Sequence, residues 1–248
     1  MESAKMNQLK EDAFQFGVEL NEKQLSQFQK YYEMLIEWNE KINLTAITEF
    51  EEVLKKHFLD SISIGRLISQ NEEISILDIG TGAGFPGIPI KIAFPCVKVT
   101  LLDSLNKRVN FLNEVIKELS LEGISALHGR AEDFAKKKEM REQFDFCVSR
   151  AVANLTTLSE YCIPYVKEGG SFISYKSGKV KEEIKEVVKL EESKGETAGE
   201  FIEIGNNKDL TQSVEVLPQT GSDNSFILFC TVIFLIIGVC SLKKYKTL

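Results

Sequence analysis

Apolar positions follow a helical period in the first part of the chain. Between residues 21 and 38, Leu25, Phe28, Tyr32 and Leu35 recur three or four residues apart, with glutamates and lysines between them. This spacing places apolar side chains on one face of a helix, and a second stretch with the same spacing covers residues 50–68. The pattern predicts two amphipathic helices, joined by a connector at residues 42–48.

From residue 74 the period changes to short apolar runs of the kind that form buried strands. Strands are predicted at residues 74–80, 98–104, 124–129, 144–151 and 170–177. Helices are predicted between them at residues 87–94 and 107–119. Strands that alternate with helices indicate an α/β fold with a parallel sheet covered on both faces.

The C-terminal part follows neither pattern. Residues 191–216 are polar and predict a linker, although 200–205 and 213–218 could form short strands. Residues 226–240 carry no charge and precede Lys243, Lys244 and Lys246. This run is shorter than the roughly 17 to 25 apolar residues that span a bilayer, but the lysines fit a positive-inside anchor. We therefore expect a single hydrophobic helix, with membrane contact through residues 226–242.

Composition narrows the class of protein. The 248 residues are 43% hydrophobic and 27% charged, which is ordinary for a globular protein. A net charge of −7 argues against tight, non-specific nucleic-acid binding but leaves room for a local basic patch. The five cysteines have no metal-ligand spacing, which indicates free thiols and no metal site. The N-terminus lacks the apolar core of a secretory signal, so a cytoplasmic body is expected.

A glycine-rich loop follows the first predicted strand, in the run LDIGTGAGFPGIP at residues 77–89. Gly80, Gly82 and Gly84 predict a turn at which the backbone approaches a ligand closely. The same run satisfies GxGxxG, so a dinucleotide site is an alternative that this pattern alone does not exclude. Asp103 ends the next strand, where a carboxylate can accept hydrogen bonds from both ribose hydroxyls of an adenosine.

Two residues favour S-adenosylmethionine over a nicotinamide dinucleotide at this loop. Asp78 stands just before the first glycine, where a carboxylate can pair with the ammonium group of S-adenosylmethionine but would repel a pyrophosphate. Phe85 offers an apolar wall where a dehydrogenase needs close helix packing. A strand-to-helix turn without a ligand would not explain why two strand-end aspartates flank the glycines.

Several motifs together carry a family resemblance. They are residues 31–48 (YYEMLIEWNEKINLTAIT), 56–64 (KHFLDSISI), 77–89, 99–104 (VTLLDS), 128–134 (HGRAEDF) and 149–153 (SRAVA). From about residue 14 to about residue 185 the chain closely resembles the bacterial small-subunit rRNA guanine-N7 methyltransferase G family, once called glucose-inhibited division protein B. The resemblance implies a class I (Rossmann-like) methyltransferase fold with an N-terminal helical extension. It also implies methylation of N7 of one guanine in 16S rRNA.

The resemblance and the loop argument together define a predicted cofactor site. The resemblance places Gly80, Phe85, Ala131, Glu132 and Arg150 there, and the loop argument adds Asp78, Gly82 and Asp103. No catalytic residue is predicted, because guanine N7 carries a lone pair and no proton and therefore needs no general base. The strand ending in SRAVANL also lacks the NPPY or DPPY of amino-directed methyltransferases, which argues against adenine as the target.

The expected partner is 16S rRNA or the small ribosomal subunit. Candidate contacts to RNA phosphates are Arg108, Arg130 and Lys176. Asn39 and Asn43 could contact RNA or simply cap and turn the chain. His57 is interpreted as an interface residue between helix and core rather than as a base paired with Asp60. His128 could lie near the adenine or serve in a turn.

The last residues resemble a different kind of sequence. LPQTG at residues 217–221, followed by the apolar run and the lysines, resembles the sortase sorting signal of Gram-positive surface proteins, which is cleaved between the residues corresponding to Thr220 and Gly221. Sorting by sortase requires export. The simplest hypothesis is a fusion of two reading frames, with the family's last two strands missing, a sheet edge exposed, and stability and RNA affinity lowered.

The predicted organisation is a helical extension at 1–70, a methyltransferase core at 71–190, a linker at 191–216 and the sorting-like segment at 217–248. The alternative function is a wall-anchored surface protein that displays a non-catalytic methyltransferase-like domain. A dehydrogenase, the third reading, would bind NAD and not S-adenosylmethionine.

Overall fold

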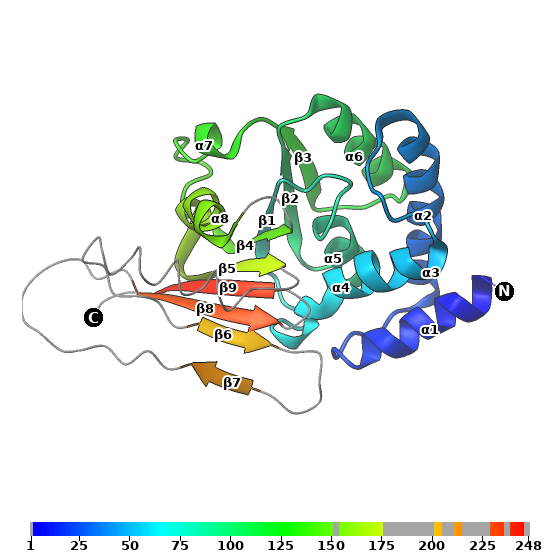
Figure 1. The fold of residues 1–248 in the computed structure, drawn as a ribbon, viewed down its shortest axis with the longest axis horizontal. Helices are drawn as coiled ribbons and strands as arrows, with labels where there is room; N and C mark the ends of the chain where they lie inside the picture. Colours follow the sequence, from blue (N-terminus) through cyan, green and yellow to red (C-terminus); the bar gives the residue numbers. More distant parts are fainter. Residues whose placement is uncertain are drawn as a thin grey trace, which may run out of the picture. The chain divides into compact units, whose positions relative to one another are not determined.

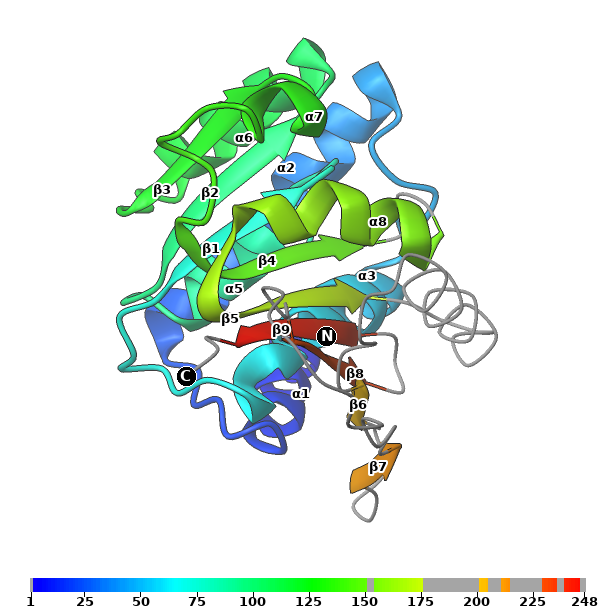
Figure 2. The same cartoon turned by 90° about the vertical axis from the view of Figure 1, so that its left-hand side faces the viewer.

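The computed structural model describes residues 2–150, 154–175, 201–204, 211–214, 229–235 and 239–245. The chain forms two compact units, Met1–Arg130 and Ala131–Leu248. Figures 1 and 2 show the course of the chain from two directions. The glycine loop lies in the first unit, so that unit is described in more detail.

Helices form the N-terminal half of the first unit. These are α1 (Glu2–Phe14), α2 (Glu22–Ile42), α3 (Phe50–Val53), the π-helix η1 (Leu54–Leu59), α4 (Asp60–Ile62) and the 3-10 helix η2 (Ser63–Arg66). The predicted helix at 21–38 is confirmed as α2. The predicted helix at 50–68 is helical over most of its length but is divided into α, π and 3-10 turns. Helix α1 was not predicted.

Local sequence explains both ends of α2. Asn21 begins the helix with a capping box, in which its side chain accepts from the Gln24 N–H (3.0 Å) and the Gln24 side chain accepts from the Asn21 N–H (2.9 Å). Asn43 ends the helix in the left-handed conformation, with φ 50°. Helix α2 packs on the core through Gln24, whose side-chain amide donates to the Ile92 carbonyl (2.8 Å). It also packs through Trp38, whose ring centroid lies 5.5 Å from that of Phe111.

The first unit contains three parallel strands in the order β3-β2-β1. Their bounds are β1 (Ser75–Ile79), β2 (Lys98–Asp103) and β3 (Ile124–His128), and the helices after the first two are α5 (Gly87–Ala93) and α6 (Asn106–Glu118). Ile76, Leu77 and Leu101 are fully buried. Burial of this kind in β1 and β2 is typical of a parallel sheet. The three predicted strands and two predicted helices are confirmed.

The second unit contains α7 (Ala131–Phe134), β4 (Phe144–Arg150), α8 (Leu155–Cys162), the 3-10 helix η3 (Ile163–Tyr165), β5 (Val166–Tyr175), β6 (Phe201–Ile204), β7 (Thr211–Val214), β8 (Phe229–Leu235) and β9 (Val239–Tyr245). Its strands follow the order β4-β5-β9-β8-β6-β7. The pair β4 and β5 is parallel, and β9 is antiparallel to both β5 and β8. Both strands predicted in this unit before residue 190 are present.

The C-terminal prediction of one hydrophobic helix is wrong for the residues that the structure describes. Residues 229–235 and 239–245 are the antiparallel strands β8 and β9 (Figure 2). Strand β8 contains Thr231, Val232 and Ile233, and such β-branched residues favour strands. A short apolar run has no period that distinguishes a buried strand from a helix, which is why the sequence pattern predicted the wrong element.

The predicted open edge is also wrong within the second unit, because β9 pairs with β5 along Ser171–Tyr175. Strand β6 confirms the strand predicted at 200–205, and β7 overlaps the one predicted at 213–218. Both interrupt the stretch predicted as a polar linker. Within the described ranges, no helix is long and apolar enough to cross a membrane.

Candidate cofactor-binding site

The glycine loop connects β1 to α5 with three glycines in the left-handed region. Their φ angles are 68° at Gly80, 62° at Gly82 and 96° at Gly84. Residues with a Cβ rarely adopt these angles, so the turn depends on glycine at these positions. The N–H groups of Gly80 and Thr81 both point to the Leu102 carbonyl, at 2.8 and 3.4 Å, which holds the start of the loop on β2.

Asp78 holds the two ends of the loop together. Its carboxylate is fully buried, and its Oδ2 accepts from the Thr81 hydroxyl at 2.6 Å and from the Gly87 N–H at 2.9 Å. Charge-assisted hydrogen bonds of this kind are stronger than neutral ones. Asp78 therefore has a structural role in the loop, in addition to the ligand contact predicted for it.

Asp103 connects the end of β2 to the middle of the loop. The residue is 2% exposed, and its Oδ2 accepts from the Gly82 N–H at 2.9 Å. Its Oδ1 accepts from the Leu105 N–H at 2.8 Å, and the Arg108 guanidinium lies 3.5 Å from Oδ2. A carboxylate has about four acceptor positions, so these contacts leave Asp103 able to accept further hydrogen bonds from a ligand.

The glycines of the GxGxxG pattern serve different purposes. A Cβ at Gly84 would lie 2.5 Å from Ile88 Cδ1 and 2.7 Å from the Tyr31 hydroxyl, and one at Gly87 would lie 2.3 Å from Leu101 Cδ2. Packing inside the protein therefore favours glycine at both positions. A Cβ at Gly82 would have the Gly80 carbonyl oxygen as its nearest neighbour, at 3.9 Å. Gly82 thus borders open space beside the Asp103 carboxylate.

The ring of Phe85 packs against the N-terminal helices. Its centroid lies 4.5 Å from that of His57, with planes 24° apart, and 5.4 Å from that of Tyr31. Phe85 is 5% exposed, so other parts of the protein cover most of the ring surface that the sequence predicts to face a ligand. His57 Nε2 lies 3.0 Å from the Thr45 hydroxyl, in keeping with its interpretation as an interface residue.

The second unit holds the other three predicted cofactor residues. Ala131 begins α7 with 9% exposure, Glu132 follows it on the surface, and Arg150 ends β4 half-buried. The Tyr165 hydroxyl donates to the Ala131 carbonyl at 2.5 Å. Burial is the main cause that raises the pKa of Tyr165 above its ordinary value, so the hydroxyl stays a donor well above neutral pH.

The residues predicted to contact RNA have several different surroundings. Asn39 accepts from the Thr45 N–H at 2.8 Å and Asn43 caps α2, so both have structural roles in the turn after that helix. Arg108 faces Asp103, Arg130 is exposed, and His128 Nε2 lies 3.1 Å from the Ser104 carbonyl. Lys176, Thr220 and Gly221 lie outside the described residues. Among the residues that are described, no cluster of side chains could hold a metal ion.

Comparison with known proteins identifies the family. The model of the family described as "rRNA small subunit methyltransferase G" (GidB) matches residues 24–211. The chain belongs to this family. The match continues past about residue 185, where the resemblance in the motifs ends, and includes strand β6.

Similar proteins carry the same description. The chain is 61% identical over 170 residues to "Ribosomal RNA small subunit methyltransferase G" of Lachnoclostridium phytofermentans, covering 68% of this chain and 70% of the relative. It is 56% identical over 187 residues to the protein of that name in Desulforamulus reducens, covering 75% and 78%. An O-methyltransferase from Bacillus cereus, solved in complex with SAH, shares the fold at a TM-score of 0.51 and 15% identity, covering 87% and 91%.

Sequence reasoning missed two tyrosines of this family member. Tyr31 donates to the Ala83 carbonyl inside the glycine loop at 2.5 Å, and Tyr165 donates to the carbonyl of Ala131. Each pair is far apart along the chain, so no local spacing reveals it. Tyr31 was not among the apolar positions predicted for its helix, and Tyr165 ends a short 3-10 helix that was not predicted.

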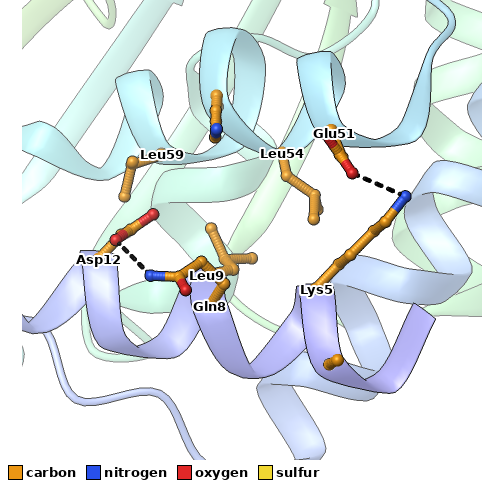
Figure 3. A pocket seen from close by; sticks show the side chains of 9 residues that line it. Lys5, Gln8, Leu9, Asp12, Glu51, Leu54 and Leu59 are labelled. Atoms are coloured by element: carbon orange, nitrogen blue, oxygen red, sulfur yellow. Dashed lines mark hydrogen bonds and ion pairs between the residues drawn. The ribbon is translucent and has the colours of Figure 1, made fainter. Parts of the chain in front are cut away.

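A separate pocket of about 380 Å³ lies between α1 and residues 51–59 (Figure 3). Leu9, Leu54 and Leu59 supply apolar walls, and a Lys5–Glu51 ion pair of 2.9 Å crosses one end. None of its lining residues belongs to the glycine loop or to the predicted cofactor set. This pocket is therefore not the candidate cofactor site.

Proposed function

We propose that this chain transfers the methyl group of S-adenosylmethionine to N7 of a guanine in 16S ribosomal RNA. Membership of the rRNA small subunit methyltransferase G family supports the reaction class, and the names of the similar proteins support ribosomal RNA as the substrate. The observation that carries the proposal at the level of residues is the open space at Gly82 beside the Asp103 carboxylate.

The residues around that space suit the cofactor. Gly82 allows the ligand to approach the backbone, and Asp103 retains acceptor positions for the two ribose hydroxyls. The acidic character of the loop suits a ligand that carries an ammonium group and a sulfonium rather than a pyrophosphate. We propose that Asp78, Gly80, Gly82, Phe85 and Asp103 of the first unit bind the cofactor. On the family resemblance, we propose the same role for Ala131, Glu132 and Arg150 of the second unit.

The chemistry needs few groups from the protein. Bound S-adenosylmethionine supplies a methyl group on a positively charged sulfur. Guanine N7 offers a lone pair and has no proton to lose, so no residue has to act as a general base. The protein's contribution is to hold the guanine in line with the methyl group and to exclude water, and such alignment can lower the barrier by about 7–11 kcal/mol.

Methyl transfer to ribosomal subunits tests the proposal. The full chain, purified in mild detergent, is mixed with labelled S-adenosylmethionine and small subunits that lack the modification, and the nucleosides are then separated. We expect label in N7-methylguanosine, and none with subunits that already carry the methyl group. Label in another nucleoside would refute the target atom, and absence of both transfer and cofactor binding would refute the proposal.

We further propose, from the sequence alone, that residues 217–248 are a sortase-type sorting signal joined to the methyltransferase by fusion. LPQTG, the apolar run and the final lysines support it. The strands β8 and β9 argue against a helical anchor formed by the same residues. The family assignment favours an enzyme that meets ribosomes in the cytoplasm over a wall-anchored display protein.

Fractionation tests the proposed membrane contact of residues 226–242. The full chain and a variant ending at residue 216 are expressed, and the membrane and soluble fractions are compared by immunoblotting. A sorting-type anchor predicts that only the full chain sediments with membranes and that detergent releases it. The variant lacks β8 and β9, so any shorter chain that sediments and resists detergent counts as aggregate. Equal amounts of detergent-released chain in the two membrane fractions would refute the anchor.

A further inference from the structure

A hydrogen bond joins the N-terminal helices to the middle of the glycine loop. Tyr31 of α2 is fully buried, and its hydroxyl donates to the Ala83 carbonyl at 2.5 Å. Ala83 is 4% exposed and stands between Gly82 and Gly84. A carbonyl buried at this depth needs a donor, because an unsatisfied one costs free energy.

An aromatic cluster surrounds this hydrogen bond. The ring of Tyr31 is nearly parallel to that of Phe58, with centroids 5.4 Å apart, and contacts Phe85, which also stacks on His57. His57 and Phe58 are consecutive residues, and their ring centroids lie 4.5 and 6.1 Å from that of Phe85. In an α-helix, consecutive side chains point about 100° apart. These two belong to the π-helix η1, a conformation that is frequent at functional sites.

Two hydrogen bonds therefore hold the backbone on either side of the open space. Asp103 accepts from the N–H of Gly82, which fixes the peptide group before that glycine. Tyr31 donates to the carbonyl of Ala83, which fixes the peptide group two positions later. A loop fixed at both sides needs no ordering when a ligand binds, and this saves the conformational entropy that a mobile loop would lose.

We propose that Tyr31 is a positioning residue, through which the N-terminal helices set the conformation of the loop for S-adenosylmethionine. The inference rests on the proposed function, since it assumes that this loop binds the cofactor. Without the Tyr31 hydroxyl, the Ala83 peptide turns to find another donor, and the ligand has to restore the original conformation. The loss therefore appears in cofactor affinity rather than only in folding stability.

Tyr31→Phe and Tyr32→Phe form a matched pair for the test. Both residues lie on α2, and each substitution removes one hydroxyl that donates to a backbone carbonyl, but Tyr32 donates to Thr48 (3.0 Å), outside the loop. Calorimetry measures the dissociation constant of S-adenosylmethionine for the full chain. We expect it to rise about fivefold to tenfold in Tyr31→Phe and to stay within about twofold of the parent value in Tyr32→Phe, in line with the loss of one buried hydrogen bond.

Kinetics separate positioning from a purely structural role. Positioning predicts that Tyr31→Phe raises the KM for S-adenosylmethionine and leaves the KM for small subunits unchanged. A fall in affinity that matches the unfolded fraction from a urea titration would overturn the inference. So would an unchanged dissociation constant in folded Tyr31→Phe. If the unsubstituted chain failed to bind S-adenosylmethionine, the proposed function itself would be refuted.

A second pair of variants covers the case in which Tyr31→Phe does not fold. His57→Ala removes the ring that stacks on Phe85, and His57→Phe retains a ring of similar shape while losing the contact with Thr45. We expect His57→Ala to weaken cofactor binding and His57→Phe to restore most of it. Equal affinities in the two variants would refute the role of the cluster in setting the loop.

Discussion

Gly82→Ala should strongly weaken cofactor binding while leaving the protein folded. The φ angle of Gly82 is 62°, and a Cβ there would meet nothing closer than the Gly80 carbonyl oxygen at 3.9 Å. The methyl group therefore fits inside the protein, but it enters the space in which we place the ligand. Gly17 is a matched control, because its φ is 74° and its Cβ would have only the Gly65 carbonyl oxygen nearby, at 4.0 Å.

The magnitude follows from the backbone and the geometry of contact. A left-handed conformation costs a residue with a Cβ about 1–2 kcal/mol, so both variants should lose about that much unfolding free energy. Neither adds a clash with the protein's own atoms. A ligand in van der Waals contact with Gly82 would have to move by about the size of a methyl group, which we expect to weaken binding by about tenfold to a hundredfold, since overpacking by one such group costs about 1–3 kcal/mol.

Urea unfolding and calorimetry with S-adenosylmethionine measure the two quantities separately. The expected result is similar stability in Gly82→Ala and Gly17→Ala, with cofactor binding strongly weakened only in the first. If Gly82→Ala bound the cofactor as tightly as the parent chain, the open space beside Asp103 would not be the ligand site. If Gly17→Ala weakened binding as much, the effect would come from stability and not from contact.

Further predictions concern the carboxylate, its arginine and a buried tyrosine. Asp103→Asn keeps the side-chain shape but removes the charge, and should raise the cofactor dissociation constant by about tenfold or more, since hydrogen bonds to charged groups are worth about 1.5–3 kcal/mol; unchanged calorimetric affinity would exclude Asp103 from the site. Arg108→Ala should weaken cofactor binding, because its guanidinium lies 3.5 Å from the Asp103 carboxylate, and should leave the salt dependence of subunit binding unaltered. If the slope of log binding constant against log salt concentration fell by about one, Arg108 would instead be a phosphate contact. Burial raises the pKa of Tyr165 above 10.0, so its contribution to stability is complete below about pH 10 and decreases as the pH rises further. Between about pH 8 and pH 11, urea unfolding should therefore show a steeper loss for the parent chain than for Tyr165→Phe, and parallel curves would contradict this.

The strands and the glycine loop could be predicted from sequence because their signals are local. Residues 75–79 and 98–103 are short segments rich in isoleucine, leucine and valine that end in or next to aspartate, and such a composition is typical of a buried parallel strand. The left-handed glycines between β1 and α5 follow from the same short segment. Asp103 lies beside the loop because the carboxyl ends of adjacent parallel strands meet at one edge of the sheet. Its contact with the ribose of a cofactor stays a prediction.

Other features depend on which segments meet in three dimensions. Residues 229–235 and 239–245 form strands because β5 and β8 offer β9 hydrogen-bonding partners on both sides, and the apolar pattern of a short run does not indicate such partners. The apolar spacing likewise put Tyr32 on the core-facing side of the helix at residues 21–38, whereas the structure buries its neighbour Tyr31, whose hydroxyl reaches Ala83. Apolar spacing determines that a side chain is buried, whereas the packing of distant segments decides which buried polar atom it contacts.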